Sequence, residues 1–130
     1  MTVPIEVLFL KALLLTDGVE TLVLFLVIKL WLKIPRAVLS NALLLFSGIY
    51  CSATTVPYLW FVLPPLWRRL SLPDSLGSYR YALFLVVGES LVFLAEAVFY
   101  FFVLRIGVWR SLLVSLVCNA ASLVAGFVIF

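Results

Sequence analysis

Four long apolar stretches follow one another along the chain, separated by short groups of polar residues. They run from about Val7 to Leu32, from about Ala37 to Leu63, from about Tyr81 to Leu104 and from about Val108 to Phe130. A helix needs about 20 apolar residues to cross a hydrocarbon core of about 30 Å. The pattern therefore predicts an all-α integral membrane protein with four transmembrane helices and no sheet.

The connections between these stretches are of two kinds. Residues 33–36 join the first pair and residues 105–107 join the second, so each pair is expected to form an antiparallel hairpin. Pro35 is expected in the first turn of the second helix, where its missing N–H costs no hydrogen bond. The middle connection, residues 64–80, combines prolines, polar turn residues, aromatics and arginines, which predicts a loop along the membrane surface. The expected interfacial anchors in and just before this loop are Trp60, Trp67, Arg68 and Arg69.

The composition indicates that lipid is the solvent of this fold. Apolar residues make up 66% of the 130 residues and charged residues only 12%, whereas a soluble domain carries about 25% charged residues. The polar side chains are too few to cover a water-exposed surface. Residues 1–130 are therefore expected to form one transmembrane domain in contact with the lipid bilayer. The Lys and Arg residues near the span ends, five on one side against three or four on the other, favour both termini outside.

The chain contains no histidine, and this absence narrows the possible chemistry. Haem ligation by His, Ser-His and Cys-His nucleophile pairs and the usual zinc sites all lose their commonest residue. Cys51 and Cys118 lie within apolar stretches, where packing as small apolar groups is favoured over a disulfide. We expect no cofactor, no metal and no nucleic-acid partner. An enzyme would have to use carboxylates alone, and we expect no enzyme.

Two short motifs recur in the same order in the two halves of the chain. Glu20-Thr-Leu-Val matches Glu89-Ser-Leu-Val, and Cys51-Ser-Ala-Thr-Thr matches Cys118-Asn-Ala-Ala-Ser. The order and the spacing of the motifs predict that one hairpin was duplicated. Because each copy holds two spans, the copies keep the same orientation in the membrane, as parallel repeats do. The expected copies are residues 7–63 and 81–130.

A second set of positions carries a resemblance to other proteins. The positions are Thr16 and Glu20, then Ser52-x-x-Thr55-x-Pro57-x-x-Trp60, then Glu89 and Glu96, and finally Asn119-x-x-Ser122-x-x-x-Gly126. This pattern resembles an uncharacterised class of small prokaryotic four-span membrane proteins, in which Asn takes the place of Ser52. The resemblance implies four spans in a prokaryotic cytoplasmic (inner) membrane, and it brings no known activity.

Four of the six acidic residues fall inside the predicted spans: Asp17, Glu20, Glu89 and Glu96. An ionised carboxylate at the centre of a membrane helix costs about 2.5–3.5 kcal/mol, so such residues usually face a bundle interior or a cavity. Glu89 and Glu96 are seven residues apart and share one helix face. Asp17 and Glu20 are three apart and share another. We therefore expect the carboxylates to point into the bundle or into a subunit interface.

Distances counted along the helices predict which polar residues lie at the same depth. At 1.5 Å per residue, Glu96 and Asn119 both lie about 13–14 Å from the second hairpin turn. Glu20 and Ser52 both lie about 24 Å from the first, nearer the other membrane face. Glu96 should therefore meet Asn119. Further candidate hydrogen-bond partners of the carboxylates are Thr55, Ser122, Tyr100 and water.

Small residues recur at three- and four-residue steps along the last span. They are Ser111, Ser115, Cys118, Ser122 and Gly126. Small residues at this spacing let helices approach closely, so a packing seam is favoured over the lining of a pore.

The sequence leaves two interpretations of the carboxylates open, interhelical hydrogen bonding or a proton or cation site. The favoured function is that of a non-catalytic subunit or scaffold of a larger membrane complex, because the short loops leave no soluble active domain. The alternative is a small proton- or cation-coupled transporter or channel, with Glu20, Glu89 and Glu96 as coupling groups. The partners would be other membrane subunits in the first case and copies of this chain in the second.

Overall fold

The computed structural model describes residues 4–70, 77 and 79–129, and this part of the chain is helical and contains no strand. Two π-helical segments, η1 and η2, continue the helices that precede them, so the elements form four long rods. The elements are α1 (Ile5–Leu26), η1 (Val27–Trp31), α2 (Asn41–Pro57), η2 (Tyr58–Val62), α3 (Leu63–Arg69), α4 (Tyr79–Leu104) and α5 (Val108–Ile129).

Three of the four rods are long and apolar enough to cross a membrane: Asn41–Arg69, Tyr79–Leu104 and Val108–Ile129. The rod formed by α1 and η1 carries more charge. Every stretch of 18 residues within it holds at least three charged side chains, which come from Glu6, Lys11, Asp17, Glu20 and Lys29. Length and composition therefore indicate a helical membrane protein.

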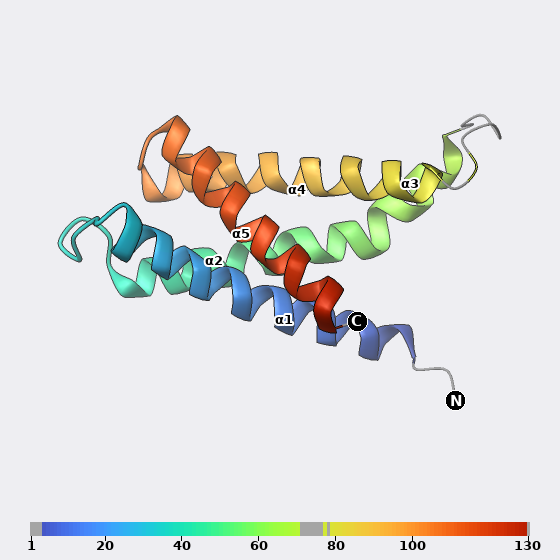
Figure 1. Cartoon of the computed structure of the whole chain (residues 1–130), viewed down its shortest axis with the longest axis horizontal. Coiled ribbons are helices and arrows are strands. Elements are labelled where there is room, and N and C mark those ends of the chain that lie inside the picture. Colours follow the sequence, from blue (N-terminus) through green and yellow to red (C-terminus); the bar gives the residue numbers. More distant parts are fainter. Residues whose placement is uncertain (1–3, 71–76, 78, 130) are drawn as a thin grey trace.

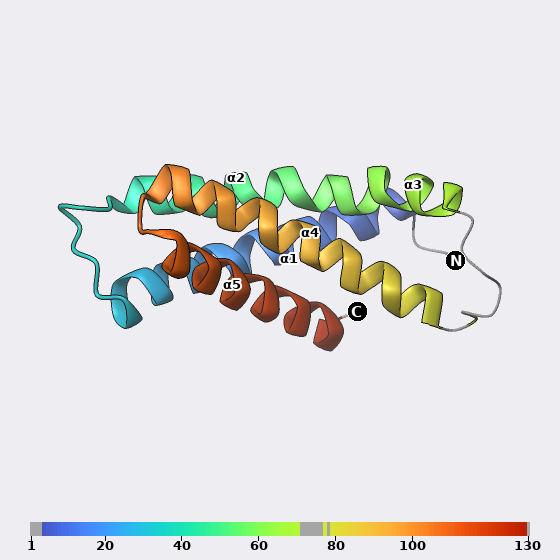
Figure 2. The ribbon, with the colours of Figure 1, turned by 90° about the horizontal axis from the view of Figure 1, so that it is seen from above.

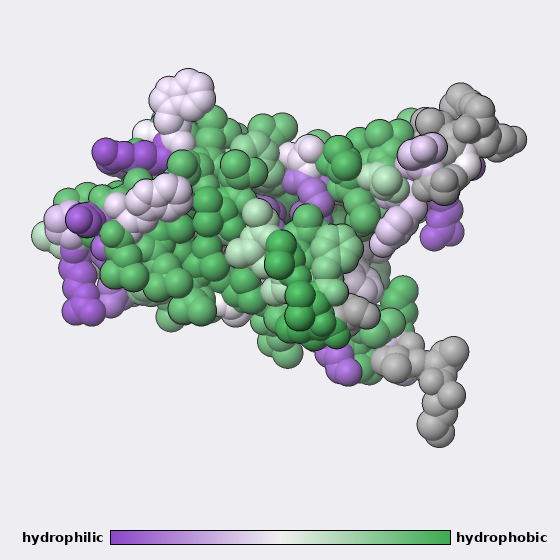
Figure 3. All heavy atoms as spheres, in the orientation of Figure 1, coloured by the Kyte–Doolittle hydropathy of each residue, from purple (hydrophilic) through white to green (hydrophobic). Residues whose placement is uncertain are grey.

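The rods run up and down in turn. α1 and α4 point one way, while α2 and α5 point the other (Figures 1 and 2). Residues 32–40 and 105–107 lie together at one end of the bundle, which we call the turn end. The first and last described residues lie toward the other end, which we call the terminal end. α1 packs against both α2 and α5, and α5 packs against α4. Apolar residues cover much of the surface in Figure 3, and hydrophilic residues gather at the turn end.

The core is densely packed toward the turn end. Its fully buried large side chains include Leu24, Ile28, Leu44, Tyr100 and Val114. The backbones of α1 and α2 also approach closely here. A Cβ added to Gly48 would lie 2.9 Å from the Cα of Thr21, so only glycine fits at this crossing.

The second rod begins later than the sequence predicted. Pro35 does not open a helix, because residues 32–40 form an irregular connection with a turn in which the Val38 N–H donates to the Pro35 carbonyl at 3.0 Å. The helix begins instead at Asn41. Ser40 is its N-cap, and the Ser40 Oγ accepts from the Leu43 N–H at 3.1 Å. Lys29 holds the connection by donating from Nζ to the Leu39 carbonyl at 2.7 Å.

The same rod ends later than predicted. Pro64 and Pro65 do not end it, because they occupy the first turn of α3, where a proline N–H is not needed. The expected interfacial loop over residues 64–80 is therefore helical up to Arg69, and residues 71–76 and 78 lie outside the described residues. The π-helical segment η2 starts directly after Pro57, which offers no N–H to the carbonyl four residues earlier.

Candidate functional site

Two glutamates lie in the middle of the bundle, and each is only 1% exposed: Glu20 on α1 and Glu96 on α4. Both carboxylate oxygens of Glu20 accept a hydrogen bond. The Ser52 hydroxyl donates to one oxygen at 2.6 Å and the Ser122 hydroxyl donates to the other at 2.8 Å. One donor comes from the hairpin of Glu20 and the other from the second hairpin.

Glu96 is held in the same way. The side-chain amide of Asn119, in its own hairpin, donates to one oxygen, and the Thr55 hydroxyl, in the other hairpin, donates to the second oxygen at 3.2 Å. The contact between Glu96 and Asn119 confirms the prediction from depth. Each hairpin therefore supplies one buried acid, one donor to its own acid and one donor to the acid of the other hairpin.

The two acids lie nearer in depth than the sequence predicted. Ser52 and Thr55 are three residues apart on α2, as are Asn119 and Ser122 on α5, which separates the two sets of hydrogen bonds by about 4.5 Å along the helices. The predicted depth of about 24 Å for Glu20 was wrong because residues 32–40 are not helical. Counted from the observed helix ends, the depth is about 16–17 Å. We call these two acids and their four donors the acid layer.

The hydrogen bonds indicate a different equivalence between residues of the two hairpins than the sequence motifs do. The sequence motif pairs Glu20 with Glu89, whereas Glu96 makes the contacts equivalent to those of Glu20. In the first hairpin Glu20 and Ser52 are 32 residues apart in the sequence, whereas in the second Glu96 and Asn119 are 23 apart. The irregular residues 32–40 account for most of this difference.

Each hydroxyl of the acid layer has a second acceptor on its own helix. The Ser52 Oγ lies 3.2 Å from the Gly48 carbonyl, and the Thr55 Oγ1 lies 2.9 Å from the Cys51 carbonyl. The Ser122 Oγ lies 3.1 Å from the backbone carbonyl three residues earlier. A hydroxyl has one proton to donate and can also accept. It can therefore donate to an ionised glutamate, or turn to the backbone and accept from a protonated one.

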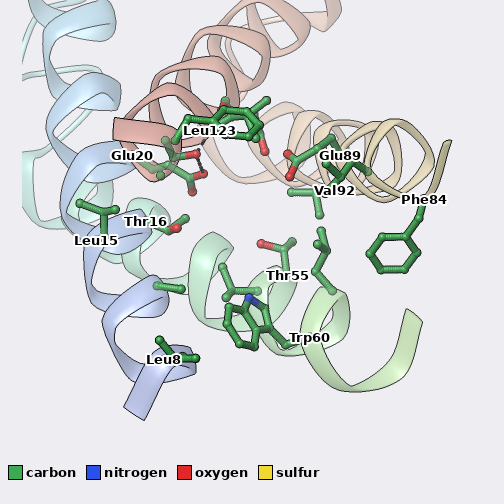
Figure 4. A pocket seen from close by; sticks show the side chains of 18 of the residues that line it. Leu8, Leu15, Thr16, Glu20, Thr55, Trp60, Phe84, Glu89, Val92 and Leu123 are labelled. Atoms are coloured by element: carbon green, nitrogen blue, oxygen red, sulfur yellow. Dashed lines mark hydrogen bonds between the residues drawn. The ribbon is translucent and has the colours of Figure 1, made fainter. Parts of the chain in front are cut away.

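A cavity of about 610 Å³ opens beside the acid layer toward the terminal end, between α1, α2 with its continuation, α4 and α5 (Figure 4). Its polar lining comes mainly from Thr16, Glu20, Thr55, Glu89, Asn119 and Ser122. The rest is mostly apolar or aromatic, with Trp60, Tyr81, Phe84 and Phe127 among the large side chains. None of the lining residues is Lys or Arg.

Glu89 differs from the other two glutamates. Its side chain is half-buried and points into the cavity in Figure 4. No hydrogen bond joins it to another of the described residues, so none of the side chains proposed as its partner is bonded to it, and pairing with water stays a prediction. The carboxylate of Glu89 therefore faces open space inside the cavity.

The remaining polar candidates take different places. Asp17 does not line the cavity, and its buried Oδ1 has no hydrogen-bond partner in the described structure. The Tyr100 hydroxyl is buried beside the thiols of Cys51 and Cys118 and makes no hydrogen bond to Glu96. Cys51 and Cys118 are free and buried, and the Cys118 thiol donates to the Glu20 carbonyl at 3.7 Å. The cysteines therefore pack as small groups, as expected.

The predicted seam on the last helix forms over most of its length. Ser111, Ser115 and Cys118 are buried, and the Ser115 hydroxyl donates across to the Phe93 carbonyl of α4 at 2.8 Å. Gly126 lies beyond the seam and lines the cavity, where an added Cβ would meet nothing within 4 Å.

The proposed anchors lie toward the terminal end. Trp60 lines the cavity and packs edge-on against Phe9, with ring centroids 5.8 Å apart. Trp67 packs in the same way against Phe84 at 5.6 Å. Arg68 and Arg69 are exposed in the last turn of α3. Their role as membrane anchors stays a prediction.

Sequence reasoning missed Gly48 and the cavity. Gly48 stands four residues before Ser52, a spacing of small residues that could have marked the close crossing with α1. The cavity has no such signal, because it depends on how far the helices diverge at the terminal end.

Comparison with other proteins adds no further assignment: no family model, no curated protein and no solved structure matches this chain. The fold and the lining of the site define the chain as a helical membrane protein with a carboxylate-lined cavity, and its function has to be argued from that geometry.

Proposed function

We propose that this protein is a small proton- or cation-coupled membrane transport protein whose coupling groups are the buried glutamates. The observation that carries the proposal is the acid layer at the base of the cavity. Glu20 and Glu96 accept hydrogen bonds from hydroxyl groups that can also donate to a backbone carbonyl and accept from a protonated carboxyl group. Each glutamate can therefore gain or lose a proton with little more than rotation of these hydroxyls.

The proposal includes α1 with η1 as a fourth span. The rod from Ile5 to Trp31 is about 40 Å long, more than the hydrocarbon thickness of about 30 Å. Glu20, one of its charged residues, is buried in the bundle and so is shielded from lipid. The matching hydrogen bonds of Glu20 and Glu96 support a duplicated hairpin. The resemblance to small prokaryotic four-span proteins points to the cytoplasmic membrane of a prokaryote.

The closed end of the bundle favours a carrier over an open channel. Beyond the acid layer, the fully buried side chains of Leu24, Leu44, Tyr100 and Val114 fill the interior toward the turn end. Transport therefore requires the helices to rearrange so that the cavity closes at one end and opens at the other, as in alternating access.

Proton flux into liposomes tests this function. The purified chain should dissipate an imposed pH gradient, with sodium, potassium or an organic ammonium ion supplied on the opposite side. Glu96→Gln keeps the shape and the hydrogen bonds of the side chain but removes titration, so it should fold normally and lose the flux. The control is Glu6→Gln, which removes an exposed carboxylate near the start of α1 and should keep the flux. Unchanged flux in Glu96→Gln would contradict the proposal.

A second candidate is the subunit or scaffold that the sequence favoured, and one observation supports it. Tyr50 is 46% exposed on α2, about 13 Å from the helix start, where a lipid-facing hydroxyl is unfavourable. It stacks between Phe46 and Phe99, with ring centroids 5.3 and 5.2 Å away. This aromatic row offers a face for a helix of another subunit. Co-purification of a stoichiometric membrane partner, together with absent proton flux, would favour this function.

A further inference from the structure

The cavity has the size and lining of a site for a small organic molecule. Ligand sites are usually about 300–1,000 Å³, mostly apolar, with a few polar groups that fix orientation. This cavity measures about 610 Å³ and is walled chiefly by aliphatic and aromatic side chains. Its occupant must therefore be largely apolar.

The cavity is lined by acidic side chains, Glu20 and Glu89, and by no basic ones. The oxygens of Glu20 are already engaged by Ser52 and Ser122, whereas Glu89 has no hydrogen-bond partner among the described residues. An ionised carboxylate in apolar surroundings is costly unless a cation approaches it. Glu89 is therefore the group that a ligand cation would pair with.

The surroundings of Glu89 favour an organic cation over a metal ion. Mg²⁺ and Ca²⁺ need about six or more oxygen ligands, and the described residues contain no group of three His, Cys, Asp or Glu side chains that could hold a metal ion. Aromatic rings, in contrast, attract organic cations through their faces. Trp60 and Phe84 both line the cavity that Glu89 faces (Figure 4).

We propose that the cavity binds a lipophilic organic cation, with its charge near the Glu89 carboxylate and its apolar body against the wall that contains Trp60 and Phe84. This inference rests on the proposed function and names its substrate class. Because Glu89 must be ionised to pair with the cation, protons compete with the ligand for this site. Binding of the cation should therefore weaken as the pH falls.

Two probes of equal shape and opposite charge test the proposal by equilibrium dialysis with the full chain in detergent. Tetraphenylphosphonium should bind saturably and at least about tenfold more tightly than tetraphenylborate. Glu89→Gln should weaken tetraphenylphosphonium binding by about tenfold or more, whereas Glu6→Gln should leave it unchanged. Equal binding of both probes, or wild-type binding in a folded Glu89→Gln variant, would overturn the proposal.

A pair of glycine substitutions keeps the test independent of the glutamate. Gly126→Leu places a side chain in the cavity without a clash, because an added Cβ there meets nothing within 4 Å. Gly18→Leu is the matched control, since Gly18 is exposed on α1, has equal space and does not line the cavity. Only Gly126→Leu should reduce binding of tetraphenylphosphonium, and equal binding by both variants would contradict a ligand in the cavity.

The outcome of the binding test is separate from the outcome of the flux test. Proton flux without tetraphenylphosphonium binding would refute the lipophilic cation and leave the transport function standing. Charge-selective binding that Glu89→Gln abolishes, without proton flux under any cation, would support the cation site and contradict the coupling.

Discussion

The two halves of the bundle, on either side of the acid layer, are built differently. Toward the turn end the interior is filled, and Leu24, Ile28 and Leu44 are fully buried. Toward the terminal end, α1 has no buried residue before Glu20, and α5 has none after Asn119. On these two helices burial stops at the acid layer, although Gly88 and Val92 on α4 and Leu63 on α3 are buried beyond it. The polar residues therefore mark the boundary between a more closely packed half and a more open half. The difference indicates that the buried acids separate a packed seal from a cavity that can admit a ligand.

The largest expected effect compares the same substitution in the two halves. Gly48→Ala places a methyl group 2.9 Å from the Thr21 Cα, so α1 has to move away, at a cost of about 3 kcal/mol. Gly126→Ala meets open space and should stabilise its helix by up to about 1 kcal/mol. Thermal unfolding of the two variants in detergent measures the difference. Equal stability of the two would show that the halves are packed alike.

The second prediction concerns the boundary itself. Glu96→Leu leaves one amide N–H of Asn119 without its acceptor, whereas Thr55 keeps the Cys51 carbonyl. The variant should destabilise the fold by about 2 kcal/mol, within the range for an unpaired buried polar group. Glu96→Gln retains an acceptor and should unfold near the wild-type temperature. Chemical unfolding of the purified variants distinguishes them. A leucine variant as stable as the glutamine variant would mean that the acid layer does not hold the helices together.

A smaller effect tests whether the closed half is dry. The buried hydroxyl of Tyr100 has only the weakly accepting thiols of Cys51 and Cys118 beside it, so Tyr100→Phe should raise stability by at most about 1 kcal/mol. Tyr50→Phe alters an exposed side chain and should change stability little. If Tyr100→Phe were destabilising, the hydroxyl would have a partner, such as water, and the seal would be wet.

The sequence predicted the acids within the spans and two of their hydrogen-bond partners, because depth along a helix follows from its fixed rise per residue. It placed Glu96 beside Asn119 and set Glu20 level with Ser52. It failed where the helix ends depend on local hydrogen bonds. Pro35 is as compatible with a turn as with a first helical turn, and the Ser40 cap decides between them.

The match of Glu20 with Glu89 failed for a related reason. Similar residues in two motifs do not show how much of the chain between them is helical. Because residues 32–40 are irregular, Glu20 takes the position in its hairpin that Glu96, not Glu89, takes in the other. The free carboxylate of Glu89 and the cavity around it depend on how the helices diverge, which periodicity does not record.

The smallest expected effect lies in the two connections of the closed half. Lys33 and Arg105 follow the first and third rods with positive φ values of 53° and 52°. A left-handed conformation costs a non-glycine residue roughly 1–2 kcal/mol, partly offset by the greater chain entropy of glycine. Lys33→Gly should therefore stabilise the fold by less than about 1 kcal/mol. Lys11→Gly, within α1, should destabilise it by a similar amount. Unfolding temperatures that ranked the two the other way would contradict the strain at Lys33.

The most direct test of the central claim is one-sided chemical access to the cavity. In sealed vesicles, Gly126→Cys should react with a membrane-impermeant maleimide from the side of the chain termini and not from the other side. The native thiols, Cys51 and Cys118, are buried in the packed interior and should react from neither side. Modification of Gly126→Cys from the opposite side, or no modification at all, would contradict a cavity that opens at the terminal end and is sealed at the turn end.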